Sequence, residues 1–282
     1  MDIVDTQVHF NQIGLLDAGL AAMAAVGVQS LLFDDFSGKY DEKNRPLPGY
    51  ELPKGVFRPV CPEAENAATR HPDRFGILRR VDYRDPDLDS IVKLMAAAPY
   101  VSALRVLALD EPQREAMDKG EFENLFEIAS RYDLPAVVLV PGHAGLLKPY
   151  AEKFPDLRLV IDHCGAPQQR HVPAEALDPV LRLAHYRNVI LKWSHAPFFF
   201  AATPYPFPDA VALLQRALAA FGPGRIMWGS DFTVTAEFAS WAEKLFYVRD
   251  AAALSSSEKE WILGRTARHI LRWSAKEKTN AI

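Results

Sequence analysis

The sequence predicts one (β/α)8 barrel, an α/β fold that occupies residues 1–282 as a single domain. Three observations favour it: eight short apolar runs of strand length, helical periodicity between them, and no motif typical of open nucleotide-binding sheets. The length of 282 residues agrees equally with two domains of about 150 residues or one barrel of about 250. The number of strands favours the barrel.

The eight apolar runs are nearly continuous, as expected for parallel strands that are buried on both faces. In chain order they are Ile3–Val8, Val28–Phe33, Phe75–Val81, Ala103–Leu107, Ala136–Val140, Leu157–Ile161, Val189–Trp193 and Ile226–Gly229. No GxGxxG follows the first run, and no GxxxxGK[ST] occurs anywhere. A dinucleotide-binding sheet and a phosphate-binding loop therefore lose their main support.

Helices are expected between the runs, because apolar residues there recur at spacings of three and four. The segments are Gly14–Val26, Leu88–Ala97, Glu121–Tyr132, Leu146–Phe154, Pro173–His185 and Asp209–Phe221. Two long connections without periodicity, 34–59 and 194–208, each follow a strand. Connections after strands form the mouth of a barrel, where active sites are built, so we expect both to line the site.

Charge, apolar runs and cysteine content indicate which partners and which cellular location to expect. Lys and Arg number 32 against 36 Asp and Glu, a formal net charge of −4, so we expect no nucleic-acid partner. No apolar run approaches the roughly 20 residues that span a membrane, and Asp2 and Asp5 lie where a secretory leader would be basic. Cys61 and Cys164 are distant in sequence and are expected to be apolar, unpaired residues. We predict a cytoplasmic protein with a small-molecule substrate, and a homo-oligomer stays open.

Polar residues collect at the ends of the apolar runs. Strand alternation places Asp5, Gln7 and His9 on one face of the first run, with Gln7 and His9 in the barrel interior. His163 ends the sixth run and Asp231 ends the eighth. Because the carboxyl ends of barrel strands meet at one mouth, these side chains are expected to converge there.

Other charged and polar groups follow the remaining strands. His143 follows the fifth run, and Lys192 and His195 lie at the end of the seventh. Arg105 lies within the fourth run, where an arginine either pairs with a carboxylate or receives an anionic substrate. The other histidines are expected in surface or structural positions: His71, His171, His185 and His269.

Four segments resemble the amidohydrolase superfamily, specifically the family 2 branch of TIM-barrel hydrolases that includes sugar lactonases and 2-pyrone-4,6-dicarboxylate lactonase. VDTQVHF at 4–10 is similar to the opening HxH strand, and FPDLRLVIDHCGAP at 154–167 to the sixth strand. RIMWGSDF at 225–232 resembles the eighth strand, and GRTARHILRW at 264–273 the closing helix. The resemblance covers nearly the whole chain and implies a TIM barrel with hydrolase activity.

The resemblance also indicates which residues would bind a metal ion in this chain. Metal-dependent members use the HxH pair, further histidines and the strand-eight aspartate as ligands, but Gln7 stands here in place of the first histidine. A carboxamide is a poorer ligand for a transition metal than imidazole, so we expect catalysis without a metal cofactor. One divalent ion, Zn or Mn, is the alternative, with His9, His143, His163 and Asp231 as its expected ligands.

The resemblance predicts a lactonase that opens the cyclic ester of a sugar acid or of an aromatic-degradation intermediate. Asp231 is expected to activate water as a base, His9 and His163 to donate to the carbonyl oxygen, and His143 to protonate the leaving alkoxide. The substrate-binding residues expected are Gln7, Arg105, Lys192, His195, Phe199 and Tyr205.

Two other functions stay open. A metal-dependent, non-oxidative decarboxylase of an aromatic or enoic acid would use the aromatic segment 198–207 to stack a flat substrate. A non-catalytic barrel that binds a small molecule is compatible with the change at Gln7. Metal content distinguishes the first alternative from a metal-free lactonase, and binding without product would identify the second.

Overall fold

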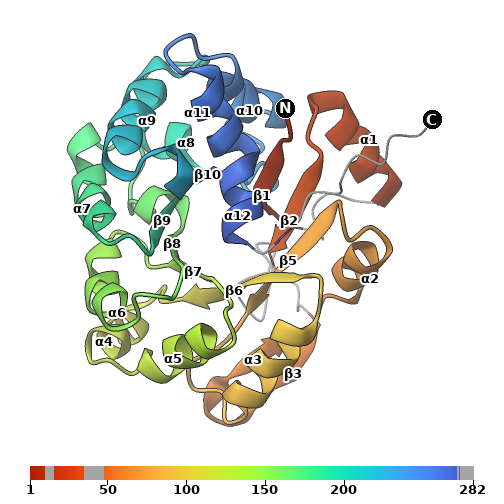
Figure 1. Cartoon of the computed structure of the whole chain (residues 1–282). Coiled ribbons are helices and arrows are strands. Elements are labelled where there is room, and N and C mark those ends of the chain that lie inside the picture. The colour runs from red at the N-terminus through yellow and green to blue at the C-terminus, as the bar shows by residue number, and fades with distance from the viewer. Residues whose placement is uncertain (10–15, 35–47, 272, 274–282) are drawn as a thin grey trace.

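The computed structural model describes residues 1–9, 16–34, 48–271 and 273. Its central feature is a parallel sheet of eight strands surrounded by helices (Figure 1). The strands, in their order around the sheet, are β1 (Val4–Val8), β2 (Ser30–Asp34), β5 (Phe75–Arg80), β6 (Val101–Leu107), β7 (Ala136–Leu139), β8 (Leu159–Ile161), β9 (Val189–Trp193) and β10 (Ile226–Trp228). Each predicted apolar run contains or overlaps one of them. The predicted barrel is confirmed.

Helices follow most strands and cover the outside of the sheet (Figure 1). They are α1 (Leu16–Val26), α2 (Pro62–Arg70), α3 (Leu88–Ala97), α4 (Glu111–Asp118), α5 (Glu123–Arg131), α6 (Lys148–Lys153), α7 (Asp178–Arg182), α8 (Ala196–Phe200), α9 (Pro208–Phe221), α10 (Trp241–Arg249), α11 (Ser256–Glu260) and α12 (Thr266–Ile270). None of the described helices combines the length and apolar character that a membrane crossing requires.

One predicted helix, Pro173–His185, is broken into three short pieces. A 3-10 turn at Ala174–Leu177 precedes α7, and a second at Leu183–His185 follows it. Pro179 lies in the first turn of α7. In the middle of the predicted helix 173–185, this proline lacks the N–H that a continuous helix needs and its ring crowds the preceding turn. A new helix therefore begins close to Pro179.

Both long connections contain structure that the sequence did not predict. Within 34–59, β3 (Gly49–Glu51) pairs antiparallel with β4 (Phe57–Pro59), and residues 35–47 lie outside the described part. Gly49 is required in this hairpin because a Cβ would collide with the Phe57 ring. Within 194–208, α8 forms directly after β9. Elements this short show no recognisable period in a sequence.

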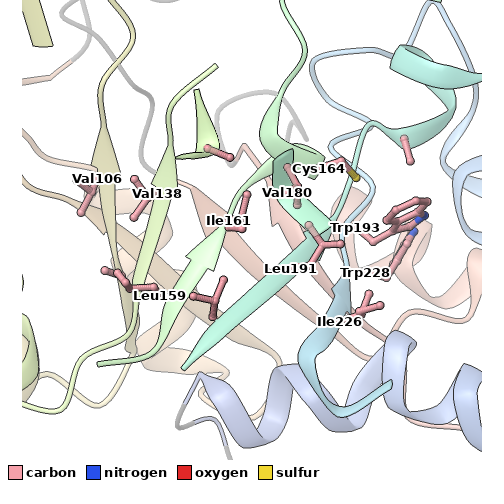
Figure 2. Close-up of a cluster of buried hydrophobic side chains, with 14 of the residues drawn as sticks. Val106, Val138, Leu159, Ile161, Cys164, Val180, Leu191, Trp193, Ile226 and Trp228 are labelled. Atoms are coloured by element: carbon pink, nitrogen blue, oxygen red, sulfur yellow. The ribbon is translucent and has the colours of Figure 1, made fainter. Parts of the chain in front are cut away.

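The barrel interior begins with an apolar layer to which each strand contributes one side chain. Its members are Val4, Leu32, Leu78, Ala103, Val137, Val160, Ile190 and Met227. Residues that alternate with these point outward and form a second hydrophobic cluster between the strands and the helices. Figure 2 shows part of this outer cluster, including Val106, Val138 and Leu191. Side chains two positions beyond the apolar layer face the interior nearer the mouth.

The seam between β10 and β1 is closed by side chains as well as backbone. Asp231 N donates to Gln7 O at 3.0 Å, and Thr6 Oγ1 donates to Trp228 O at 2.7 Å. The Asp5 carboxylate accepts from Ser230 N at 2.8 Å and from Trp241 Nε1 at 2.8 Å. It therefore ties both strands to α10.

This seam corrects the prediction that Asp5 shares a face with Gln7. Asp5 points toward α10, whereas the Gln7 amide bonds to Asp34 and Lys192 inside the barrel. The cause is a register shift between β1 and β2 that falls between Asp5 and Val8. Strict alternation does not hold across such an irregularity.

Asp5 makes stability depend on pH in a defined direction. Burial, partly offset by hydrogen bonds from Ser230, Gln7 and Trp241, raises the pKa of Asp5 from 3.8 to about 6. A raised folded-state pKa contributes stability below about pH 4 that is lost as the pH rises through about 6. We compare the unfolding free energies of wild type and Asp5→Asn. The value for wild type minus that for Asp5→Asn should fall by at most roughly 3 kcal/mol over this range. Urea unfolding of both proteins from pH 4 to 7 measures this, and a constant difference would contradict it.

Candidate active site

Asp231 lies just beyond β10, and three imidazoles surround its carboxylate. His195 Nε2 is 2.5 Å from Oδ2, and His163 Nε2 is 3.7 Å from the same oxygen. His9 Nε2 is 3.5 Å from Oδ1. These side chains follow β1, β8, β9 and β10, and each is largely buried. The structure thus brings His9, His163, His195 and Asp231 together at one mouth of the barrel.

Three of these residues have an unusual backbone. His163, His195 and Asp231 have φ angles of 47°, 58° and 44°, in the left-handed region that residues with a side chain rarely adopt. Each such residue costs of order 1–3 kcal/mol, and such strain tends to persist at functional sites. Each turn comes within three residues of a strand end and holds its side chain in the cluster.

The electrostatics keep Asp231 ionised. Burial alone would raise the pKa of Asp231, but His195 first, then His9 and His163, hold it well below its ordinary value. Burial, with His195 nearby, lowers the pKa of His163 well below 6.5, so its ring is neutral near pH 7. An ionised carboxylate beside a neutral imidazole suits metal binding, because neither group has to lose a proton to act as a ligand.

The residues present fit a divalent metal ion. One nitrogen each of His163 and His195 and one oxygen of Asp231 lie within 4.8 Å of one another. Two imidazoles and a carboxylate form a typical catalytic zinc ligand set. His163 Nδ1 is 2.7 Å from Ser194 Oγ, an outer contact of the kind that fixes a ligating ring. The buried Asp231 Oδ1 has no hydrogen-bond partner among the described residues.

Directly beneath this cluster, five side chains form a closed polar ring. Gln7 Nε2 donates to Asp34 Oδ2 at 2.7 Å, and Gln7 Oε1 accepts from Lys192 Nζ. Lys192 Nζ is 3.3 Å from Asp162 Oδ1, and Asp162 Oδ2 accepts from Arg105 Nη1. Arg105 Nε is 3.2 Å from Asp34 Oδ2, which closes the ring. Five strands, or the residue directly after one, supply these buried groups.

The ring determines how three predicted substrate-binding residues are placed. Gln7, Arg105 and Lys192 are 0%, 2% and 0% exposed, and each is engaged with another ring member. For Arg105 this position favours the pairing alternative over an anionic substrate. Burial, with a smaller effect from Arg105, lowers the pKa of Lys192 to about 7 although Asp34 and Asp231 oppose the shift.

Of the other predicted site residues, one lies beside the Asp231 cluster and two lie away from it. The Phe199 ring centroid lies 5.8 Å from that of His195, so Phe199 borders the cluster. Tyr205 instead packs on Phe207 and is 44% exposed. His143 is exposed, and its Nε2 is 3.5 Å from the amide nitrogen of Gln168. The structure does not bring His143 or Tyr205 to Asp231.

Sequence reasoning overlooked three residues of this region: Asp34, Asp162 and Ser194. Asp34 and Asp162 lie two positions beyond Leu32 and Val160, which belong to the apolar interior layer. A period of two extended past the apolar runs would have found both carboxylates. Ser194 has no such signal, because its role depends on the turn that follows β9.

A separate cleft lies between the β3–β4 hairpin and α3. Its volume is about 350 Å³, and Arg58 and Asp85 in its wall pair with each other at 2.6 Å. None of the three metal-site side chains lines it. We therefore do not assign the reaction to this cleft.

Solved structures of known proteins share this barrel fold, and a curated protein is similar in sequence over part of its length. An L-fucono-1,5-lactonase of Burkholderia ambifaria is 30% identical over 158 residues, which are 55% of this chain and 54% of that protein. The chain thus matches about half the length of this curated relative. An amidohydrolase of Burkholderia multivorans with bound zinc superposes with a TM-score of 0.76 at 20% identity, covering 97% of this chain and all of that one. A structure described as a 2-pyrone-4,6-dicarboxylic acid hydrolase of Pseudomonas putida gives 0.72 at 17%, covering 97% and 98%.

The prediction that no metal is used was wrong. A protein of the same fold was crystallised with zinc, and His163, His195 and Asp231 converge here on a possible metal site. The inference from Gln7 failed because Gln7 belongs to the polar ring beneath the cluster. His195, expected to bind substrate, is one of the three residues of this possible metal site, and His143, expected as a ligand, is not.

The resemblance seen in the sequence is confirmed by a family comparison. Residues 59–273 match the family model Amidohydro_2, described as Amidohydrolase. The matched region is about three quarters of the chain and includes the segments that carry His163, His195 and Asp231. This chain belongs to the amidohydrolase family.

Proposed function

We propose that this chain hydrolyses a lactone, a cyclic ester of a sugar acid or of an aromatic-degradation intermediate. The observation that carries the proposal is the Asp231 carboxylate, buried among His9, His163 and His195. Asp231 is ionised and so can accept a proton, and among the described residues its Oδ1 has no hydrogen-bond partner and is open to a water molecule. The fuconolactonase relative supports a lactone as the substrate.

The metal ligands in this proposal are His163, His195 and Asp231, with Zn or Mn as the ion. A divalent ion in such a site polarises a carbonyl and lowers the pKa of bound water. Asp231 accepts a proton from the water that adds to the lactone carbonyl, and it returns this proton to the ring oxygen as the C–O bond breaks. The product is a hydroxy acid.

His9 is given a role in the reaction other than metal binding, because it is not in the three-residue ligand set. Its Nε2 lies 3.5 Å from Asp231 Oδ1, on the side where water would be activated. We assign it to donate a hydrogen bond to the carbonyl oxygen as negative charge develops there. Phe199, beside His195, is assigned to the wall of the substrate pocket. Protonation of the leaving oxygen, first expected of His143, is assigned to Asp231 in this proposal, because His143 is exposed and contacts Gln168.

The test compares two classes of product. Purified chain with one equivalent of zinc is supplied with sugar 1,4- and 1,5-lactones and a pyrone lactone, and acid release above spontaneous hydrolysis is recorded. Carboxylated phenols are supplied in parallel, and carbon dioxide release is recorded. We expect acid from at least one lactone, loss of that activity on chelation, and recovery with Zn or Mn. Carbon dioxide release without lactone opening would establish the decarboxylase instead.

The low cysteine content leads us to propose a cytoplasmic location, as in the sequence prediction. The buried Cys164 fits a structural thiol, because burial raises its pKa and so disfavours a reactive thiolate. A homo-oligomer stays an open prediction.

A further inference from the structure

We propose that the polar ring of Gln7, Asp34, Arg105, Asp162 and Lys192 is a positioning device that sets the proton position on His163. The inference rests on the proposed metal centre and extends it to residues that touch neither metal nor substrate. Asp162 is the junction, because it belongs to the ring and directly precedes His163 in the chain.

His163 has two ring nitrogens in different surroundings. Nδ1 is 2.7 Å from Ser194 Oγ. Nε2 is 3.3 Å from Asp162 Oδ2 and 3.7 Å from Asp231 Oδ2. A metal bound by Nε2 needs the lone pair of that nitrogen, so the proton of the neutral ring must be on Nδ1 and donate to Ser194 Oγ.

Asp162 on its own would oppose this arrangement. A carboxylate 3.3 Å from Nε2 favours a proton on that nitrogen, because the N–H could then donate to it. The ring removes the preference by engaging both carboxylate oxygens. Oδ2 accepts from Arg105, while Oδ1 accepts from the His163 backbone N at 3.0 Å and lies 3.3 Å from Lys192 Nζ.

Gln7 closes the ring without changing its charge. Two carboxylates, Asp34 and Asp162, face the Arg105 guanidinium and Lys192, which is cationic below about pH 7 because of its lowered pKa. The amide of Gln7 donates to Asp34 and accepts from Lys192, so it joins an anion to a cation as a neutral link. A carboxylate at this position would lose the donor and face Asp34. This accounts for a glutamine at position 7.

The test replaces Lys192 by Met and compares it with Lys244→Met. Lys244 is also buried, but its Nζ bonds to Thr235 O at 3.0 Å, outside the ring. Nitrogen-15 NMR of the metal-free proteins locates the proton of His163, with His163→Gln identifying its signals among the eight histidines. Zinc affinity is measured by titration on the same samples.

In wild type and Lys244→Met we expect the proton on Nδ1. In Lys192→Met the Asp162 carboxylate loses the Lys192 ammonium 3.3 Å from Oδ1 and attracts a proton on Nε2 more strongly. We therefore expect the proton to shift to Nε2, with zinc affinity reduced by about 10- to 100-fold, the range for outer-contact changes. If Lys192→Met does not fold, Gln7→Met opens the ring at unchanged charge and is expected to move both readouts in the same direction. A wild-type proton on Nε2, or ring variants with wild-type proton position and zinc affinity, would overturn the proposal.

These readouts do not depend on the substrate. Failure of every lactone to react would reject the proposed activity while leaving the NMR result interpretable. Conversely, an active lactonase whose His163 proton ignores the ring would reject only the positioning role.

Discussion

Replacing Asp231 by Asn should lower kcat for the best lactone by roughly 10²- to 10⁴-fold, the usual contribution of a general base. The amide cannot take the proton that the carboxylate accepts, although it has nearly the same shape. Asp231 is fixed by its backbone bond to Gln7 at 3.0 Å, which the substitution leaves in place, so the fold should persist. Initial rates of acid release, with circular dichroism as a check on folding, measure the effect.

Asp85→Asn is the matched control for this variant. Asp85 is also buried, but it pairs with Arg58 at 2.6 Å in the wall of the distant cleft. We expect wild-type kcat from Asp85→Asn even where its melting temperature falls. An Asp231→Asn protein that keeps more than about a tenth of wild-type kcat would exclude Asp231 as the base.

Replacing His195 by Ala should reduce zinc affinity by more than about 100-fold, which exceeds the usual effect of an outer contact. The reason is that His195 Nε2, 2.5 Å from Asp231 Oδ2, is one of three ligand atoms. His143→Ala should leave zinc affinity unchanged, because His143 is exposed and contacts Gln168. Zinc titration of both variants measures this. A loss of affinity in His143→Ala but not in His195→Ala would restore the ligand set first predicted from the sequence.

The barrel was predictable because its strands carry the signal that burial on both faces requires. Val189–Trp193, for example, is an unbroken run in the sequence except for Lys192, and β9 has the same bounds. The β3–β4 hairpin was not predictable, since three-residue strands show no period. Pro179 was visible in the sequence, but its effect on the helix expected at Pro173–His185 was overlooked.

The site was predictable in its residue types and less so in its geometry. His9, His163 and Asp231 were found because each lies at or just beyond a strand end. His195 was assigned to substrate binding because a sequence does not show that its left-handed backbone, with φ of 58°, turns the ring toward Asp231. Gln7 led to the wrong expectation of a metal-free site, and its place in the polar ring was not visible because its partners Asp34 and Lys192 are 27 and 185 residues away.

Lactone hydrolysis at the metal site is tested most simply by measuring acid release from a panel of sugar and pyrone lactones by the zinc-loaded wild-type chain. Chelated protein and Asp231→Asn are run in the same experiment, and spontaneous hydrolysis is subtracted. We expect the wild type to open at least one lactone. Chelation should abolish this rate and zinc should restore it. Asp231→Asn should be slower than the wild type by at least about 100-fold. Lactone opening at equal rates by all three samples, or by none of them, would contradict these expectations.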